Sequence, residues 1–246
     1  MKRVLIPREV PATFIHSLPE AATSALAANF LNDQGHSIAI LVEESIPKAE
    51  EWGEDVAAFM ESLNPDQKVE FHLFDSVPDP NHPDAFEKIC ERMTILSSLI
   101  RTSPKRNHLL LIATTPEALV SPCPLHERQK KSELILSAGQ EYEFEKLCST
   151  LAVDFDYSSE ILCEEPGQFS VRGGLIDIYP VNGTEPARID FFGNEIEEIR
   201  SFDPSTQRGE AILDHLFISS AQSNQEIEVE GEFFRYLSEP VSWIFR

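Results

Sequence analysis

Two arginines and a phenylalanine near the middle of the chain have the residue types of a protein-binding face. Arg188 and Phe192 lie in the run Ala-Arg-Ile-Asp-Phe-Phe, and Arg172 lies upstream in Phe-Ser-Val-Arg. Guanidinium groups donate paired hydrogen bonds to carboxylates, and an aromatic ring beside an arginine is typical of an interaction hot spot. We therefore expect both arginines to bind acidic groups of a partner, with Phe192 as an apolar anchor between them.

The period-two alternation around these residues predicts which way each side chain points. A tight turn at residues 193–194 predicts three facing pairs, namely Phe192 with Glu195, Phe191 with Ile196, and Asp190 with Glu197. Ile189, Phe191 and Ile196 then point into a core. The opposite, largely polar face carries Arg188, Asp190, Phe192 and Glu197.

The strand that precedes this hairpin changes phase at Gly173-Gly174. We expect a bulge there, which would place one set of apolar side chains in the core and turn Arg172 outward. The expected core set is Phe169, Val171, Ile176 and Ile178. The result would be a three-stranded antiparallel meander. A plainer interpretation stays open, in which Arg172 and Arg188 only pair with Asp177, Asp190 and Glu197 to keep a sheet surface solvated.

The elements before and after the meander predict an α/β fold. Near-continuous apolar runs at residues 37–42, 69–74 and 108–113 alternate with helical patterns, as in a parallel sheet covered by helices on both faces. The run at 241–245 would rejoin this sheet. We expect a discontinuous first domain, residues 1–128 plus 211–246, interrupted by a small α+β domain at residues 129–210.

Composition bounds the class of partner. The chain has 246 residues, of which 42 are acidic and 20 basic, so its formal net charge is −22. Phosphate backbones repel such a polyanion, so we expect weak or no nucleic-acid binding by this chain. Two groups of basic residues are candidates for a local patch, and loop solvation is the favoured interpretation of both: Arg101, Lys105 and Arg106, and Arg128, Lys130 and Lys131.

Four further features point away from metal, membrane and redox functions. The cysteines Cys90, Cys123, Cys148 and Cys163 are widely spaced, which favours free thiols in a reducing cytoplasm over a zinc site. No apolar run approaches the roughly 20 residues that span a bilayer. The amino terminus lacks the apolar segment of a secretory signal. The loop around His82 is too sparse in oxygen ligands for a hard cation, so we expect no metal.

Several ordered segments resemble one protein family. They are Phe-Ser-Val-Arg-Gly-Gly-Leu-Ile-Asp-Ile-Tyr-Pro, the string from Ala187 to Arg208, and, upstream, residues 84–100. Together they resemble the amino-terminal region that the bacterial transcription-repair coupling factor (Mfd) shares with the excision-repair protein UvrB. The resemblance implies a degenerate P-loop or Rossmann-like domain with an inserted domain that docks UvrA, the damage-sensing ATPase. The family's two key arginines and phenylalanine match Arg172, Arg188 and Phe192.

Catalysis is not expected of this chain. A nucleotide site needs a glycine-rich loop and a lysine, but the position where we expect that loop, residues 16–23, has neither and carries Glu20. We therefore predict a cytoplasmic, non-enzymatic docking module for UvrA that binds no cofactor. Two alternatives remain: a DNA-contacting module like that of UvrB, or a domain that binds other parts of the parent translocase and restrains it.

Overall fold

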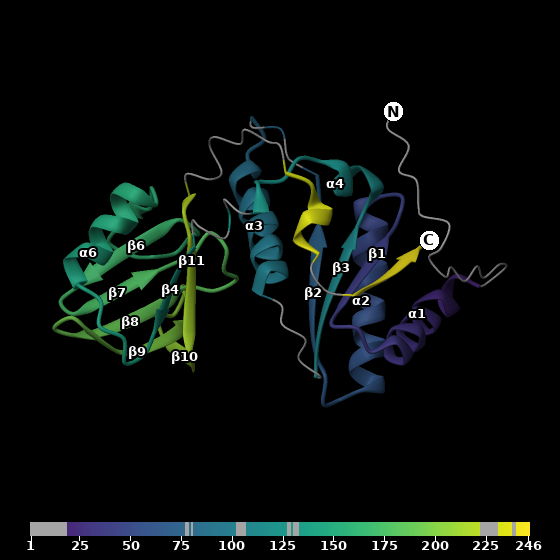
Figure 1. Cartoon of the computed structure of the whole chain (residues 1–246), viewed down its shortest axis with the longest axis horizontal. Helices are drawn as coiled ribbons and strands as arrows, with labels where there is room; N and C mark the ends of the chain where they lie inside the picture. Colours follow the sequence, from purple (N-terminus) through teal and green to yellow (C-terminus); the bar gives the residue numbers. More distant parts are fainter. Residues whose placement is uncertain are drawn as a thin grey trace.

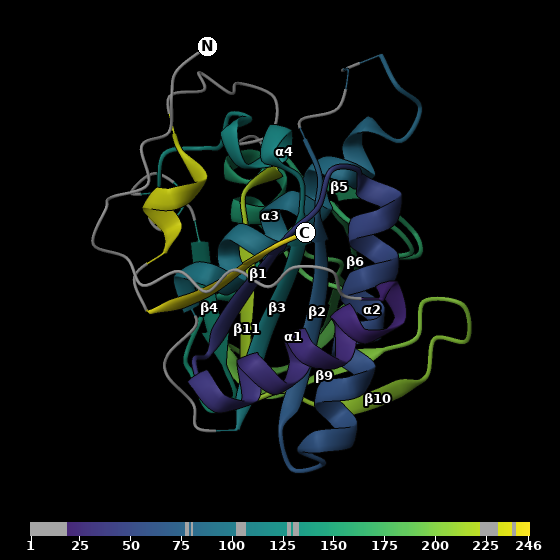
Figure 2. The same ribbon diagram turned by 90° about the vertical axis from the view of Figure 1, so that its right-hand side faces the viewer.

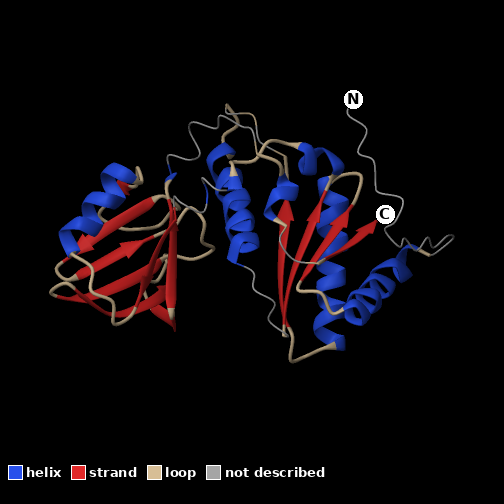
Figure 3. Cartoon of the chain, viewed as in Figure 1, coloured by secondary structure: helices blue, strands red, loops and turns tan. Residues whose placement is uncertain are grey.

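The computed structural model shows two lobes with helix α3 (Ala85–Arg101) between them (Figure 1). It describes residues 19–76, 79, 81–101, 107–126, 129, 133–221, 231–237 and 240–246. One lobe combines helices with parallel strands, whereas strands dominate the other (Figure 3). The expected mixture of a parallel sheet with an antiparallel module is confirmed.

The first lobe is built on a four-stranded parallel sheet in the order β12-β1-β3-β2. Its strands are β1 (Ile38–Val42), β2 (Lys68–Phe74), β3 (His108–Thr114) and β12 (Val241–Phe245). All five residues of β1 are buried, as expected for a continuous apolar run in a sheet covered on both faces. The prediction that the run at 241–245 rejoins this sheet is confirmed, because β12 pairs with β1 in parallel.

Helices cover both faces of the parallel sheet. Helices α1 (Glu20–Gln34) and α2 (Ile46–Leu63) pack on one face through residues such as Leu31 and Trp52, and Figure 2 shows them in front of the strands. The other face packs against α3, α4 (Pro116–Val120) and the 3-10 helix η3 (Phe233–Tyr236). Helix α2 begins at Ile46, and Pro47 lies in its first turn, where a missing N–H costs nothing.

The second lobe contains a six-stranded sheet in the order β10-β9-β8-β7-β6-β5. Its strands are β5 (Ser158–Ser159), β6 (Gln168–Arg172), β7 (Leu175–Ile178), β8 (Ala187–Phe192), β9 (Glu195–Phe202) and β10 (Gly209–Ile212). Helix α6 (Phe144–Ser149) continues into the π-helical segment η1 (Thr150–Asp154). Leu147 and Leu151 of these helices share one core with the inward side chains of the sheet.

Two details of the predicted meander are wrong. Gly173-Gly174 forms the two-residue turn of a β6–β7 hairpin rather than a bulge, since Arg172 pairs with Leu175. Such a turn reverses the parity just as a bulge does, so the sequence alone did not separate the two. Asp190 of β8 pairs with Glu198 of β9 rather than with Glu197, because the register shifts between Asp190 and Phe191. The other two predicted pairs of this hairpin are confirmed.

The predicted inward residues are mostly confirmed. Phe169, Ile176, Ile178, Ile189, Phe191 and Ile196 all belong to the core of the second lobe. Val171 does not, because 43% of its surface is exposed although it pairs with Ile176. It lies next to the last residue of β6, beside the β6–β7 turn.

Helix α3 belongs to both lobes. Its residues Ile95 and Leu99 pack in the core of the first lobe, whereas Cys90 packs in the core of the second. At its end the Arg101 Nη1 donates to Glu133 Oε1 at 2.9 Å, and its guanidinium lies 4.5 Å from the Phe217 ring centroid. Arg101 therefore joins the lobes instead of forming a basic patch. The other candidate basic residues, Lys105, Arg106, Arg128, Lys130 and Lys131, lie outside the described part of the chain.

Strand β11 (His215–Ser219) belongs with the second lobe rather than the first. It pairs antiparallel with β4 (Glu133–Ser137), and Leu216 and Ile218 pack in the second lobe's core. The expected boundary at residue 211 thus falls before a strand that packs with the inserted domain. The division into two independently folding domains stays a prediction.

We expected a loop between a strand and a helix at residues 16–23, and the described residues of that range do not form one. Residues 19–23 begin helix α1, and residues 16–18 are outside the described residues. The first strand-to-helix connection in the described part of the sheet is β1–α2 at residues 43–45, which is Glu-Glu-Ser. Glu43 is buried there and lies 3.4 Å from the Arg246 Nε. Like residues 16–23, this connection carries acid and has neither glycine nor lysine.

Candidate protein-binding surface

The three predicted site residues lie on one face of the antiparallel sheet, opposite the core. Strand pairing puts Arg188 beside Asp177 of β7 and beside Arg200 of β9. Because side chains two residues apart share a face, Arg172 and Phe192 project from the same side. We call the side of the sheet that carries Arg172, Asp177, Arg188, Asp190 and Phe192 the polar face.

Asp177 is the centre of the polar face. Its side chain is 1% exposed, and it accepts hydrogen bonds from Arg188 Nε at 2.6 Å and Arg188 Nη2 at 2.8 Å. Arg172 Nη2 donates to the same carboxylate. Two guanidinium groups thus share one buried acid, which fixes their positions relative to each other.

The loop after β9 completes this network. The Gln207 side-chain oxygen accepts from Arg172 Nη2 at 3.2 Å, and the Gln207 carbonyl lies 3.5 Å from Arg188 Nη1. Asp203 holds the loop, because its carboxylate accepts hydrogen bonds from Ser205 and Thr206. Those bonds lower the pKa of Asp203. The loop therefore reaches across the sheet and orients both arginines.

The two arginines differ in accessibility. The Arg188 side chain is 16% exposed, and its guanidinium lies 4.9 Å from the Phe202 ring centroid. Its hydrogen bonds with Asp177 raise its pKa above the ordinary value. The Arg172 side chain is 45% exposed. The guanidinium of Arg188 thus makes its hydrogen bonds within the chain, whereas that of Arg172 is also accessible to solvent.

Phe192 lies at the rim of the polar face rather than between the arginines. Its surface is 74% exposed, and it pairs with Glu195 at the β8–β9 turn. It follows Arg188 by four positions along the strand, which corresponds to ~13 Å between their Cα atoms. The expectation that Phe192 sits between the arginines is wrong, because both arginines reach back toward Asp177 while Phe192 points out at the end of β8.

Sequence reasoning did not assign roles to Asp177 and Gln207. Asp177 entered it as one of several acids that solvate the sheet, whereas it is the buried acceptor of both arginines. The signal was present, since an acid with an isoleucine on each side, at 176 and 178, points away from the core but sits in mid-sheet. Gln207 has a positive φ of 60°, which suits a turn, and its role depends on a long-range contact.

Other chemistry is sparse in the described residues. In the part of the chain that the structure describes, no three His, Cys, Asp or Glu side chains are grouped to hold a metal ion, and no helix is long and apolar enough to cross a membrane. All four cysteines are free thiols. Burial raises the pKa of Cys90 and of Cys163 to about 12, so these two thiols are unreactive near neutral pH.

A two-lobed α/β protein whose antiparallel sheet exposes a polar face with an aromatic rim has the form of an interaction module. Residues 134–223 match the family model of the UvrB interaction domain. This range covers the six-stranded sheet together with β4 and β11. The resemblance to the UvrB-homology region of transcription-repair coupling factors is confirmed.

Three curated relatives carry the same description, transcription-repair-coupling factor. The chain is 37% identical over 99 residues to that of Bacillus subtilis (strain 168), which covers 40% of this chain and 8% of the relative. It is 25% identical over 203 residues to the factor of Staphylococcus haemolyticus, a match that covers 82% of this chain and 16% of the relative. It is 24% identical over 221 residues to the factor of Staphylococcus aureus (strain Mu50), a match that covers 90% of this chain and 18% of the relative. The chain spans less than a fifth of the length of these relatives.

Proposed function

We propose that this chain is a non-catalytic docking module of a transcription-repair coupling factor, and that its polar face binds UvrA in the cytoplasm. The first lobe would then be a degenerate nucleotide-binding domain that supports the docking sheet. The match of residues 134–223 to the UvrB interaction domain supports the repair context. The acidic β1–α2 connection supports the absence of nucleotide chemistry, because Glu43 and Glu44 would repel a phosphate there.

The observation that carries this proposal is the exposure of Phe192 on the same face of the sheet as a supported arginine. A phenylalanine that is 74% exposed gains nothing from folding, whereas burying it against a partner removes its apolar surface from water. Arg172 lies on the same face, held by Asp177 and Gln207 before any partner arrives. Preorganised side chains lose little conformational entropy on binding, which is the usual property of a hot spot.

The geometry assigns the residues different roles in docking. Phe192 is the apolar anchor and Arg172 donates to an acidic group of UvrA. Arg188 positions Arg172 indirectly, since both share Asp177, and it adds the part of its guanidinium that remains accessible. Reversing the charge of Arg188 would place an acid against buried Asp177, so its effect on binding would be mixed with an effect on folding.

The sharpest test is the affinity of purified UvrA for Phe192→Ala and Arg172→Glu, measured by titration calorimetry. We expect the dissociation constant to rise about thirtyfold or more for each, in line with hot-spot side chains. Phe192→Ala should keep the wild-type unfolding midpoint, because its side chain is exposed. Arg172→Glu places an acid near buried Asp177, so Arg172→Gln, which leaves Asp177 its two hydrogen bonds from Arg188, separates lost binding from lost stability.

Matched controls exist in the first lobe. Phe245 is 63% exposed and the Arg235 side chain is 78% exposed, so Phe245→Ala and Arg235→Glu change the same residue types away from the polar face. Their affinities should stay within twofold of wild type. Unchanged UvrA affinity for both polar-face variants would refute the docking face, and DNA binding at low salt in an anisotropy titration would favour the nucleic-acid alternative.

A further inference from the structure

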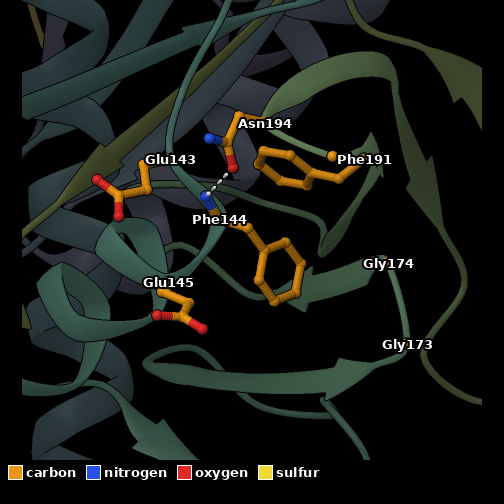
Figure 4. Close-up of a pocket in the computed structure, with 8 residues that line it drawn as sticks. Glu143, Phe144, Glu145, Gly173, Gly174, Phe191 and Asn194 are labelled. Carbon is orange, nitrogen blue, oxygen red and sulfur yellow. Dashed lines mark hydrogen bonds between the residues drawn. The ribbon is translucent and has the colours of Figure 1, made fainter.

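A second recognition element lies at the end of the docking sheet. A shallow pocket of about 410 Å³ lies between the start of α6 and the two turns of the sheet, and its lining residues are shown in Figure 4. They are Glu143, Phe144, Glu145, Gly173, Gly174, Phe191, Gly193 and Asn194. The pocket plays no part in the network around Asp177.

The walls of the pocket are held in place by backbone and aromatic contacts. The Phe144 and Phe191 rings meet edge to face with centroids 5.2 Å apart. The Tyr142 N–H donates to the Asn194 carbonyl at 2.7 Å, and the Phe144 N–H donates to the Asn194 side chain at 3.4 Å. The start of α6 is therefore tied to the β8–β9 turn, and the pocket exists before a partner binds.

Two glycines keep the pocket open. Gly173 and Gly193 have φ angles of +63° and +65°, and a Cβ atom built on either meets nothing within 4 Å. The turns need glycine for their backbone conformation. A consequence is that both turns present bare backbone to the pocket, so there is space for an incoming side chain.

The chemistry of the pocket is opposite to that of the polar face. The exposed residues Glu143 and Glu145 supply two carboxylates, Phe144 supplies an aromatic ring, and the described lining residues include no lysine or arginine. Carboxylates accept from guanidinium or ammonium groups, and such cations also bind to aromatic rings. An anionic or purely apolar group would leave the carboxylates without a partner.

The pocket and the polar face meet at the same end of the sheet. Gly173 directly follows Arg172, and Gly193 directly follows Phe192. A partner that covers Phe192 therefore reaches both turns.

We propose that this pocket receives an arginine or lysine side chain of the protein that docks on the polar face. This inference rests on the proposed function, and it specifies the partner's chemistry: an acidic group opposite Arg172 and a basic side chain in the pocket at the two turns. Two contacts of opposite sign near an apolar anchor allow one orientation of the partner and penalise the reversed one.

The test measures the UvrA affinity of the double variant Glu143→Gln and Glu145→Gln over a range of salt concentrations. We expect the dissociation constant to rise about tenfold and its salt dependence to become weaker, because a desolvated charge contact is lost. The double variant Glu51→Gln and Glu54→Gln removes two exposed acids from α2 and should stay within twofold of wild type.

A second variant tests whether binding needs the free volume of the pocket rather than its carboxylates. Asparagine tolerates a positive φ, so Gly173→Asn places a side chain in the pocket while both carboxylates remain. It should also weaken UvrA binding by about tenfold, with an unfolding midpoint close to wild type confirming the fold.

The outcomes separate this inference from the proposed function. If Phe192→Ala weakens binding but the pocket variants bind UvrA within twofold of wild type, the pocket inference is overturned and the docking face stands. If neither Phe192→Ala nor Arg172→Glu weakens binding, the docking face falls, and with it the inference that depends on it. Weaker binding by all of these variants supports both.

Discussion

The two main sheets of this protein use their second faces differently. The parallel sheet is covered by helices on both faces, and β1 is buried throughout. The antiparallel sheet buries one face and leaves the other for Asp177, Arg188 and Phe192. Under the proposed function, stability and recognition are divided between the lobes, because a sheet without a free face has no surface to offer a flat partner.

The largest expected loss of stability comes from a change at Asp177, because this residue lies on the polar face and folding nevertheless depends on it. Asp177→Ala leaves the largely buried Arg188 without its acceptor, and removing one partner of a buried ion pair costs ~3–5 kcal/mol. Urea unfolding followed by circular dichroism would measure this loss.

Asp190→Ala is the matched control for Asp177. The Asp190 side chain is 37% exposed and lies 3.7 Å from Arg200, so its removal should cost less than about 1 kcal/mol. A similar cost at both positions would show that the Asp177 network does not support the polar face.

The second prediction concerns the parallel sheet. Leu111 of β3 is fully buried under α1 and α2, so Leu111→Ala should destabilise the protein by ~3 kcal/mol through lost burial and the cavity left behind. Ile135 of β4 is 49% exposed, and Ile135→Ala should cost about 1 kcal/mol or less. Equal losses would contradict the contrast between covered and open faces.

The smallest expected effect is a dependence of stability on pH that belongs to the first lobe. Glu70 accepts from His72 Nε2 and His108 Nε2, both at 2.9 Å, and these bonds, with His72 the larger contributor, lower the pKa of Glu70 to about 2. A lowered carboxylate pKa contributes stability above the ordinary value near 4.5, and this contribution is lost as the pH falls from there toward about 2.

Because the Glu70 side chain is 32% exposed, solvent screening reduces its contribution to ~1 kcal/mol. Denaturant unfolding of wild type and Glu70→Gln at pH 6 and pH 3 would measure it. The gap between the two proteins should narrow at pH 3, and a constant gap would exclude this carboxylate as the source.

Local patterns predicted much of the fold. The continuous apolar runs of β1 and β3 identified the parallel sheet, and the Gly193-Asn194 turn fixed the outward direction of Phe192. Two features needed the structure, because they depend on contacts between distant segments. One is the pairing of β11 with β4, which joins residues about 80 positions apart. The other is the reach of Gln207 to Arg172 across the sheet.

The sequence predicted the outward direction of the three candidate residues but not how they lie relative to one another. Alternation correctly placed Arg172, Arg188 and Phe192 outside the core. It did not indicate that Arg188 would be largely buried on that face, because a strand pattern specifies the direction of a side chain but not the neighbours that cover it. Asp177 and the loop from Asp203 to Gln207 provide that cover.

Helix α3 packs in the cores of both lobes, and this limits where the molecule can be divided into fragments. The recognised segment, residues 134–223, excludes Cys90, which fills part of the second lobe's core, and Arg101, which neutralises Glu133. Excising that segment would open a hole in its core where Cys90 packs, and would also remove the Arg101–Glu133 ion pair that ties α3 to β4. The smallest self-sufficient fragment for recombinant work therefore has to begin upstream of Ala85.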